Sequence, residues 1–107
     1  MSGVNKVLLL GYIDQQPELK QLRSNIAILS FQLTTVEEFI KDGIKNVHKE
    51  WHSITMRRNL AEAAFETLHK GMLISIEGKL TTRSFIDKEG VKRYITEIIA
   101  DKFTLLH

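Results

Sequence analysis

The chain has 107 residues, and this length predicts a single domain over residues 1–107. Its composition of 43% hydrophobic and 26% charged residues excludes a disordered chain, and its apolar runs are too short to span a membrane. Cysteine is absent, which excludes disulfides and a cysteine nucleophile, while the net charge of +2 permits an anionic partner without requiring one.

The first half of the chain predicts three strands. Residues 4–13 are rich in Val, Leu and Ile, and four consecutive apolar residues suggest a strand covered on both faces. A turn at residues 14–17 precedes a second strand over residues 26–36, where apolar and polar side chains partly alternate. Residues 37–47 contain Lys-Asp-Gly and are expected to form a mobile hairpin loop before a third strand over residues 48–58.

One helix is predicted over residues 59–70, where apolar residues recur at helical spacing. Asn59 is expected to cap its start, with Glu62 three residues later completing a capping box. Gly71 suits the left-handed conformation that often follows the last turn of a helix.

Two further strands are predicted over residues 72–85 and 91–106, around a turn at residues 87–90, and Gly78 is expected to mark a bend or bulge. The predicted order is β-β-β-α-β-β. This is the order of an OB-fold, an all-β, five-stranded Greek-key barrel with one α-helix between strands 3 and 4. An ordinary α+β sheet protein has the same order of elements, so the order alone leaves both folds open.

No group of residues points to catalysis. His48, Glu50 and His52 stand two apart on one strand face, and two histidines with a carboxylate could bind zinc or iron. The same face carries Ile54 and Met56, which favours a packed or interface histidine instead. No glycine-rich phosphate loop is present. We therefore expect no enzyme, no cofactor and no metal; a metal-dependent enzyme using these three residues is kept as an alternative.

Basic and aromatic residues are interleaved at strand spacing, which is typical of proteins that bind single-stranded nucleic acid. Trp51 and Arg57 share one strand face with only small polar residues between them, although a tryptophan there could also pack against a loop or subunit. The residues expected to contact nucleic acid are the aromatic Phe39, Trp51, Phe85 and Tyr94 and the basic Lys6, Lys41, Lys45, Lys49, Arg57, Arg83 and Arg93.

Several segments resemble bacterial single-stranded DNA-binding proteins, in the order and near the spacing of that family. They are GVNKVLLLG at 3–11, QPEL at 16–19, EWH at 50–52, LAE at 60–62, KG at 70–71, IEGKL at 76–80, TRSF at 82–85 and RY at 93–94. The resemblance implies an OB-fold that binds and protects single-stranded DNA in replication, recombination and repair. It also implies no catalysis, no cofactor, and assembly as a homotetramer, with a dimer as the alternative.

The resemblance also implies roles for single residues. Trp51, Phe39 and Phe85 match the aromatic residues on which the family stacks bases. Arg57 stands where the family commonly has an aromatic residue. Because a planar guanidinium can stack on a base and also pair with a phosphate, we expect binding to be retained with a larger electrostatic share.

Assembly and location follow from the same resemblance. The apolar first strand would pair between subunits, with Val7 and Leu9 at the interface, and His52 matches the family's interface histidine. Family members usually continue into an acidic tail that recruits replication and repair enzymes; without it, such recruitment is not expected. No secretory signal is seen, so a cytoplasmic protein is expected. The alternative function is an OB-fold primosomal accessory or protein-interaction module with weak nucleic-acid binding.

Overall fold

The computed structural model describes residues 2–106. Its elements, in chain order, are β1 (Val7–Ile13), β2 (Glu18–Gln21), a 3₁₀ turn η1 (Arg23–Asn25), β3 (Ala27–Lys41), β4 (Ile44–Arg57), α1 (Arg58–Thr67), β5 (Leu73–Ile86) and β6 (Lys92–Leu105). Within this described part of the chain, no helix is long and apolar enough to cross a membrane.

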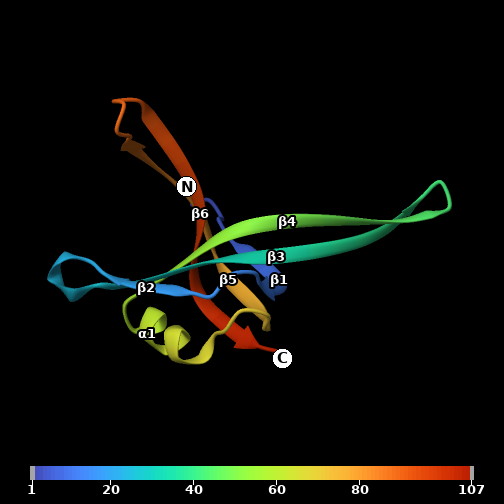
Figure 1. The fold of residues 1–107 in the computed structure, drawn as a ribbon, viewed down its shortest axis with the longest axis horizontal. Helices are drawn as coiled ribbons and strands as arrows, with labels where there is room; N and C mark the ends of the chain where they lie inside the picture. The colour runs from blue at the N-terminus through green and yellow to red at the C-terminus, as the bar shows by residue number, and fades with distance from the viewer. Residues whose placement is uncertain (1, 107) are drawn as a thin grey trace.

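The strands form one sheet that closes on itself (Figure 1). Its order is β1-β5-β6-β4-β3-β2, and a further antiparallel pairing between β1 and β3 closes a barrel of five strands. The short β2, which the sequence analysis missed, pairs only with β3 and lies outside this barrel. Because α1 lies between the third and fourth barrel strands, the predicted OB-fold topology is confirmed.

The core lies inside the barrel and follows the predicted alternation of β3 and β4. Leu29 and Leu33 of β3 and Ile54 and Met56 of β4 are at most 1% exposed. The helix packs against β2, β3 and β4 through the buried face that carries Ala64. Each fully buried aliphatic side chain contributes about 1.5–3 kcal/mol relative to exposure, so this face fixes the register of both strands.

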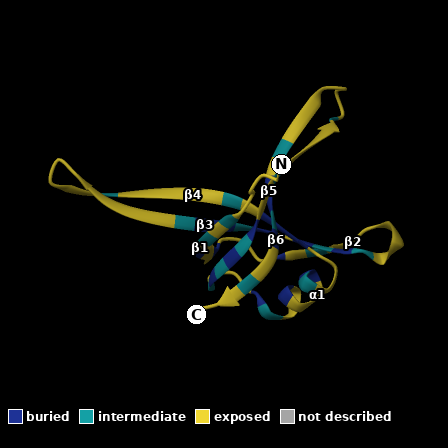
Figure 2. Ribbon diagram, turned by 180° about the vertical axis from the view of Figure 1, so that it is seen from behind, coloured by how far each residue is buried: buried dark blue, intermediate teal, exposed yellow. Residues whose placement is uncertain are grey.

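Two hairpins, β3–β4 and β5–β6, continue beyond the barrel as arms whose distal halves are exposed (Figure 2). The expected mobile loop over residues 37–47 is wrong, because β3 and β4 pair without interruption out to Lys41 and Ile44. Asp42 and Gly43 form the turn, with φ values of 53° and 76°. A two-residue Asp-Gly turn matches the twist of the flanking strands, so every other residue of the segment can join the ladder.

The first strand begins at Val7 rather than at residue 4. Ahead of it, the Asn5 side-chain amide donates to the Leu80 carbonyl at 2.7 Å, and its oxygen accepts the Leu80 N–H at 3.0 Å. A side chain therefore takes the place of the backbone ladder at this point, so the strand begins only at Val7.

The helix spans Arg58–Thr67, shorter than predicted, and no side-chain hydrogen bond caps its start. The expected capping by Asn59 with Glu62 is wrong, because Asn59 already lies inside the helix. Arg58 has a φ of 59° and makes the turn from β4 into α1. The left-handed conformation predicted for Gly71 is confirmed, with a φ of 94°.

Two glycines allow strands to approach closely. The register of β5 and β6 shifts at Gly78, which confirms the predicted bulge. At Gly11, a Cβ would overlap the backbone carbonyl oxygen of Thr34, where β1 and β3 close the barrel. Gly3, by contrast, has open space around it.

The turn predicted at residues 87–90 is confirmed at the tip of β5–β6, and the Asp87 carboxylate organises it. One oxygen accepts the N–H groups of Glu89 and Val91, each at 2.9 Å, and the other accepts the Nε–H of Arg93, also at 2.9 Å. The Arg93 guanidinium, with the Val91 N–H as a second cause, holds the pKa of Asp87 below its usual value of 3.8.

We predict that Gly11→Ala lowers the free energy of unfolding by about 1–3 kcal/mol, because the added methyl group meets a backbone atom that cannot move away. Urea unfolding at matched protein concentration measures the change. Gly3→Ala is the matched control and should unfold like the wild type. Equal midpoints for the two variants would show that β1 and β3 can separate at no cost.

We predict that the turn contacts of Asp87 depend on pH. Because the pKa of Asp87 is lowered in the folded chain, their stabilisation is present above pH 3.8 and is lost as the pH falls through the lowered pKa. The Val91 amide should lose protection from hydrogen exchange over the same range. Arg93→Gln should bring the Asp87 pKa, followed by NMR of its carboxyl carbon, back toward 3.8. An identical Asp87 pKa in both proteins would contradict this account.

Candidate nucleic-acid interface

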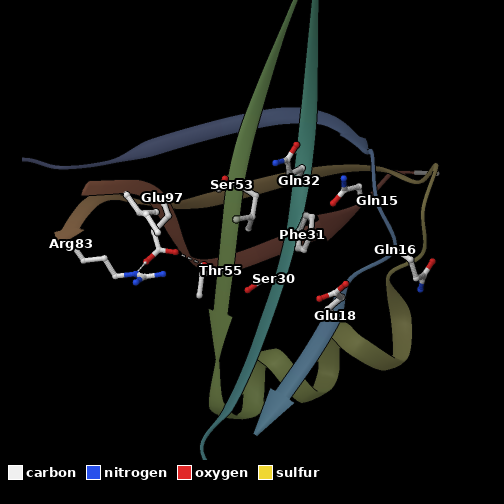
Figure 3. Close-up of a pocket in the computed structure, with 12 residues that line it drawn as sticks. Gln15, Gln16, Glu18, Ser30, Phe31, Gln32, Ser53, Thr55, Arg83 and Glu97 are labelled. Atoms are coloured by element: carbon white, nitrogen blue, oxygen red, sulfur yellow. Dashed lines mark hydrogen bonds and ion pairs between the residues drawn. The ribbon is translucent and has the colours of Figure 1, made fainter. Parts of the chain in front are cut away.

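A short parallel contact between β4 and β6 brings the two hairpins together, with Ile54 opposite Ile98 and Thr55 opposite Ile99. On the outer side of this contact lies an open pocket of about 310 Å³ (Figure 3). Most of its lining is polar, and the residues are Gln15, Gln16, Glu18, Ser30, Phe31, Gln32, Ser53, Ile54, Thr55, Arg83, Ile95 and Glu97.

The Glu97 carboxylate joins the two hairpins across this pocket. One oxygen accepts the Thr55 hydroxyl at 2.8 Å, and the other accepts the Arg83 Nε–H at 3.0 Å (Figure 3). Glu97 is only 8% exposed. The sequence analysis did not select Glu97. The signal that could have found it is a carboxylate within an apolar stretch of a strand, directly before Ile98.

Trp51, Arg57 and Arg83 lie around the same junction. Trp51 is 59% exposed on the outer face of β4 and lines a hollow of about 170 Å³ together with Leu80. Arg57 and Arg83 line a neighbouring hollow of about 290 Å³. Glu97 lines both hollows as well as the larger pocket, so one surface carries a stacking aromatic, two cations and a buried anion.

On the β5–β6 arm, Phe85 is paired in register with Arg93, and both share a face with Arg83 two residues away. Phe85 is 39% exposed, so its ring is accessible. Tyr94 lies on the opposite face, where the Lys92 ammonium stands 5.6 Å from its ring centroid. Phe85 and Arg93 therefore continue the face of Arg83, whereas Tyr94 continues the face of Leu80 and Thr96, which line the hollow of Trp51.

On the β3–β4 arm, paired residues share a face, so the register separates the predicted contacts. Lys45 and Lys49 lie on the face of Trp51, whereas Phe39 and Lys41 lie on the face that continues the barrel interior. Phe39 is 46% exposed there. The structure thus leaves Phe39 apart from Trp51, although both are accessible.

Four of the predicted basic residues carry an internal carboxylate partner: Lys6 with Glu77 at 3.1 Å, Lys45 with Glu38 at 3.2 Å, Arg83 with Glu97, and Arg93 with Asp87. Lys41, Lys49 and Arg57 have none within 4 Å among residues 2–106. Ion pairs between exposed side chains are weak in water, so the lysine pairs can exchange their carboxylate for a phosphate at little cost.

The residues considered for a metal site do not form one. His48 Nε2 lies 2.7 Å from Glu50 Oε1, while His52 Nε2 bonds the Thr35 hydroxyl at 2.9 Å. Over residues 2–106, no group of three potential ligands is placed to hold a metal ion. The metal-dependent alternative therefore has no geometric basis in the described chain.

The residues of β1 that were predicted for the subunit interface do not lie on its exposed face. Val7 and Leu9 are half-buried and pack against the core. The alternate residues of the strand point outward, with Leu8 69%, Leu10 56% and Tyr12 49% exposed. One face of β1 is therefore uncovered in the single chain, and it is not the face of the residues that the sequence analysis named.

Comparison with known proteins supports this picture. The model of the single-strand binding protein family matches residues 4–106. A single-stranded DNA-binding protein of Bacteroides thetaiotaomicron is 38% identical over 97% of this chain, and the chain spans 66% of that relative's length.

Two solved structures are similar to the fold. A Plasmodium falciparum SSB in complex with ssDNA superposes with a TM-score of 0.90 at 24% identity, covering 100% of this chain and 98% of the other; at that identity it speaks for the fold alone. A deletion mutant of the single-stranded DNA-binding protein from Thermus aquaticus gives 0.85 at 27% identity, covering 98% of this chain and 51% of the other. With its family match over nearly the whole sequence, this chain belongs to the single-strand binding protein family.

Proposed function

We propose that this chain binds single-stranded DNA, largely without sequence preference and without catalysis. The observation that carries the proposal is Trp51, a large aromatic residue 59% exposed on an outer barrel face, in a hollow that is also lined by Glu97, the ion-pair partner of Arg83. An exposed ring of this size offers a flat apolar face for stacking, and every base offers a flat partner. The names of its relatives, which are single-stranded DNA-binding proteins, support the same function.

The outer surface supplies both parts of such binding. Trp51 and Phe85 would stack bases, and Arg57, Arg83 and Arg93 would follow the phosphates between them. Lys45 and Lys49 extend the positive path along the β3–β4 arm, on the face of Trp51, and Lys6 extends it beside β5. Each stacked base is worth about 1–3 kcal/mol, so a few stacks suffice for tight binding.

Phe39, Lys41 and Tyr94 would make a second set of contacts. Phe39 and Lys41 lie on the face of the β3–β4 arm opposite Trp51, so a strand of DNA on Trp51 would reach them only by passing around that arm. Tyr94 would be reached along the face of Leu80 and Thr96, which line the hollow of Trp51. A wrapped path of this kind fits the long β3–β4 arm, which extends along the longest axis of the molecule, 55 Å in extent (Figure 1).

A second copy of the chain would cover the outward face of β1. Leu8, Leu10 and Tyr12 form an exposed apolar row beside paired backbone, which a monomer would hold at a cost. These outward residues are the proposed contact between copies. Val7 and Leu9 would support it from the core side of β1, and His52 would contribute from β4. Assembly as a homotetramer would place several DNA surfaces around one particle, with a dimer as the smaller alternative.

The setting that fits this activity is DNA replication, recombination and repair in the cytoplasm, where single strands are exposed and need protection. It is supported by the family of the chain. The binding chemistry uses stacking and charge and needs no cofactor.

The first test is titration of the protein with oligothymidylate at several salt concentrations. Trp51 is the only tryptophan, so its fluorescence reports directly on stacking and should be quenched. The logarithm of affinity should fall linearly with the logarithm of salt, by about 0.7 per phosphate contacted. Absence of quenching with excess DNA at low salt would overturn the proposal and favour the protein-interaction module.

Trp51→Ala, measured by anisotropy of a labelled oligonucleotide, should weaken binding by about 1–3 kcal/mol, roughly fivefold to a hundredfold. Phe65→Ala is the matched control, because Phe65 is a comparably exposed ring on α1, away from the outer pocket. Equal losses in both variants would show that stability, rather than stacking, was measured.

We predict that Leu10→Lys reduces the assembly to smaller species, because it places a charge in the apolar row of β1. Light scattering measures the mass. Phe65→Lys adds the same charge to an exposed apolar position of α1 and should leave the mass unchanged. A Leu10→Lys protein with the mass of the wild type would exclude this face as the interface.

A further inference from the structure

A buried anion lies beneath the surface that we propose for DNA. The side chain of Glu97 is 10% exposed, while that of Arg83 above it is 56% exposed. The three hollows that contain Trp51, Arg57 and Arg83 all share Glu97 in their lining. A carboxylate at the centre of a site for a polyanion opposes binding, so its presence there calls for a physical reason.

Both oxygens of the carboxylate are engaged, one by the Thr55 hydroxyl and one by Arg83. A buried charge is tolerated only when its lone pairs are satisfied in this way. Thr55 comes from β4 and Arg83 from β5, so Glu97 of β6 holds two neighbouring elements of the junction in fixed positions. The arrangement is therefore built from three strands rather than from one flexible surface pair.

The bond to Glu97 determines how Arg83 can meet a ligand. Its Nε–H is already donated, at 3.0 Å, which orients the planar guanidinium and leaves the terminal Nη groups for other acceptors. The carboxylate also offsets the charge of the guanidinium. Arg83 thus offers oriented donors with little net charge, whereas Arg57, which has no carboxylate within 4 Å among the described residues, offers a full cation.

We propose that Glu97 is a positioning residue that fixes Arg83 and limits the electrostatic share of DNA binding at the Trp51–Arg57–Arg83 surface. This rests on the proposed function. By holding Arg83 neutralised, Glu97 removes one counterion-releasing contact and leaves stacking as the larger part of the affinity. Binding then depends less on salt, and the strand is released more readily.

The experiment compares Glu97→Gln with wild type in oligothymidylate titrations from low to high salt. Glutamine keeps the shape and can still accept the Thr55 hydroxyl, but it leaves Arg83 as a free cation. One more phosphate contact should steepen the salt slope by about 0.7. The ratio of the affinity of Glu97→Gln to that of wild type should therefore grow about fivefold when salt is lowered from ~500 mM to ~50 mM. Glu66→Gln, on the exposed surface of α1, removes the same charge and should leave the slope unchanged.

A second pair of variants separates positioning from simple repulsion. If Glu97 acts through Arg83, the steeper slope requires that arginine, and Glu97→Gln should have no effect on the slope in an Arg83→Gln background. A gain of the same size in that background would make Glu97 a plain repulsive charge and overturn the proposal. A purely structural role would change unfolding without changing the slope.

A measurement on the wild type covers the case in which Glu97→Gln does not fold. The Nε–H of Arg83 should exchange slowly with solvent by NMR, both free and with oligothymidylate bound, while that of Arg57 exchanges fast. Rapid exchange of the Arg83 Nε–H in either state would overturn the inference. Failure of the wild type to bind DNA at all would instead contradict the proposed function.

Discussion

The two-residue parallel pairing between β4 and β6 is the contact on which the rest of the structure depends. The other pairings in the barrel are antiparallel. On one side β1 links the two hairpins by pairing with both β3 and β5, whereas on the other side this parallel pairing joins the hairpins directly. Because Thr55 stands at the pairing, the outer faces of both hairpins meet there. Without it, Trp51 and Arg83 would belong to unrelated surfaces, and the buried Glu97 would lose one of its partners.

Because the arms are paired strands rather than loops, they hold the side chains of this surface in fixed positions. An isolated two-stranded hairpin is marginally stable in water, but here each arm grows out of strands whose other ends are locked in the core. The barrel therefore supplies the register, and the arms present side chains on both faces at fixed spacing. Their exposed apolar residues, such as Ile40 and Ile44, are reasonable only on a surface that a ligand or another copy covers.

Sequence patterns predicted the elements that bury one face, and also the exposed β5–β6 arm, but failed in the outer half of the β3–β4 arm. The alternation around Leu29 and Met56 located two barrel strands, because a shift by one residue would expose the core. Beyond position 36 polar and apolar residues of this arm do not alternate, so periodicity predicts no strand there. The Asp42–Gly43 pair is typical of a two-residue hairpin turn, but the sequence analysis placed it within a longer loop. Arg58 adopts a left-handed conformation that no propensity assigns to arginine, so the cap at Asn59 was misplaced.

The sequence named candidate contact residues one by one, but it could not predict how they are arranged. Exposed aromatic and basic residues at strand spacing identified Trp51, Arg83 and Phe85, since both signals are local. The bond between Thr55 and Glu97 joins positions 42 residues apart, and no local pattern reports such a pair. The same holds for the opposite placement of Phe39 and Trp51, which follows only from the register of the two strands.

The net charge is only +2 because the chain carries nearly as many carboxylates as cations, and four of the predicted contact cations are paired with a carboxylate. A chain that bound DNA by charge alone would need an excess of free cations and would bind tightly at low salt and poorly at high salt. Under the proposed function, stacking rings among partly neutralised cations would make the affinity of each chain rest mainly on contacts that salt does not screen. The proposed assembly of several copies would then multiply these contacts along one strand, because linked sites raise the effective concentration of each for the same DNA. A modest charge per chain would thus be compensated by assembly through the uncovered face of β1.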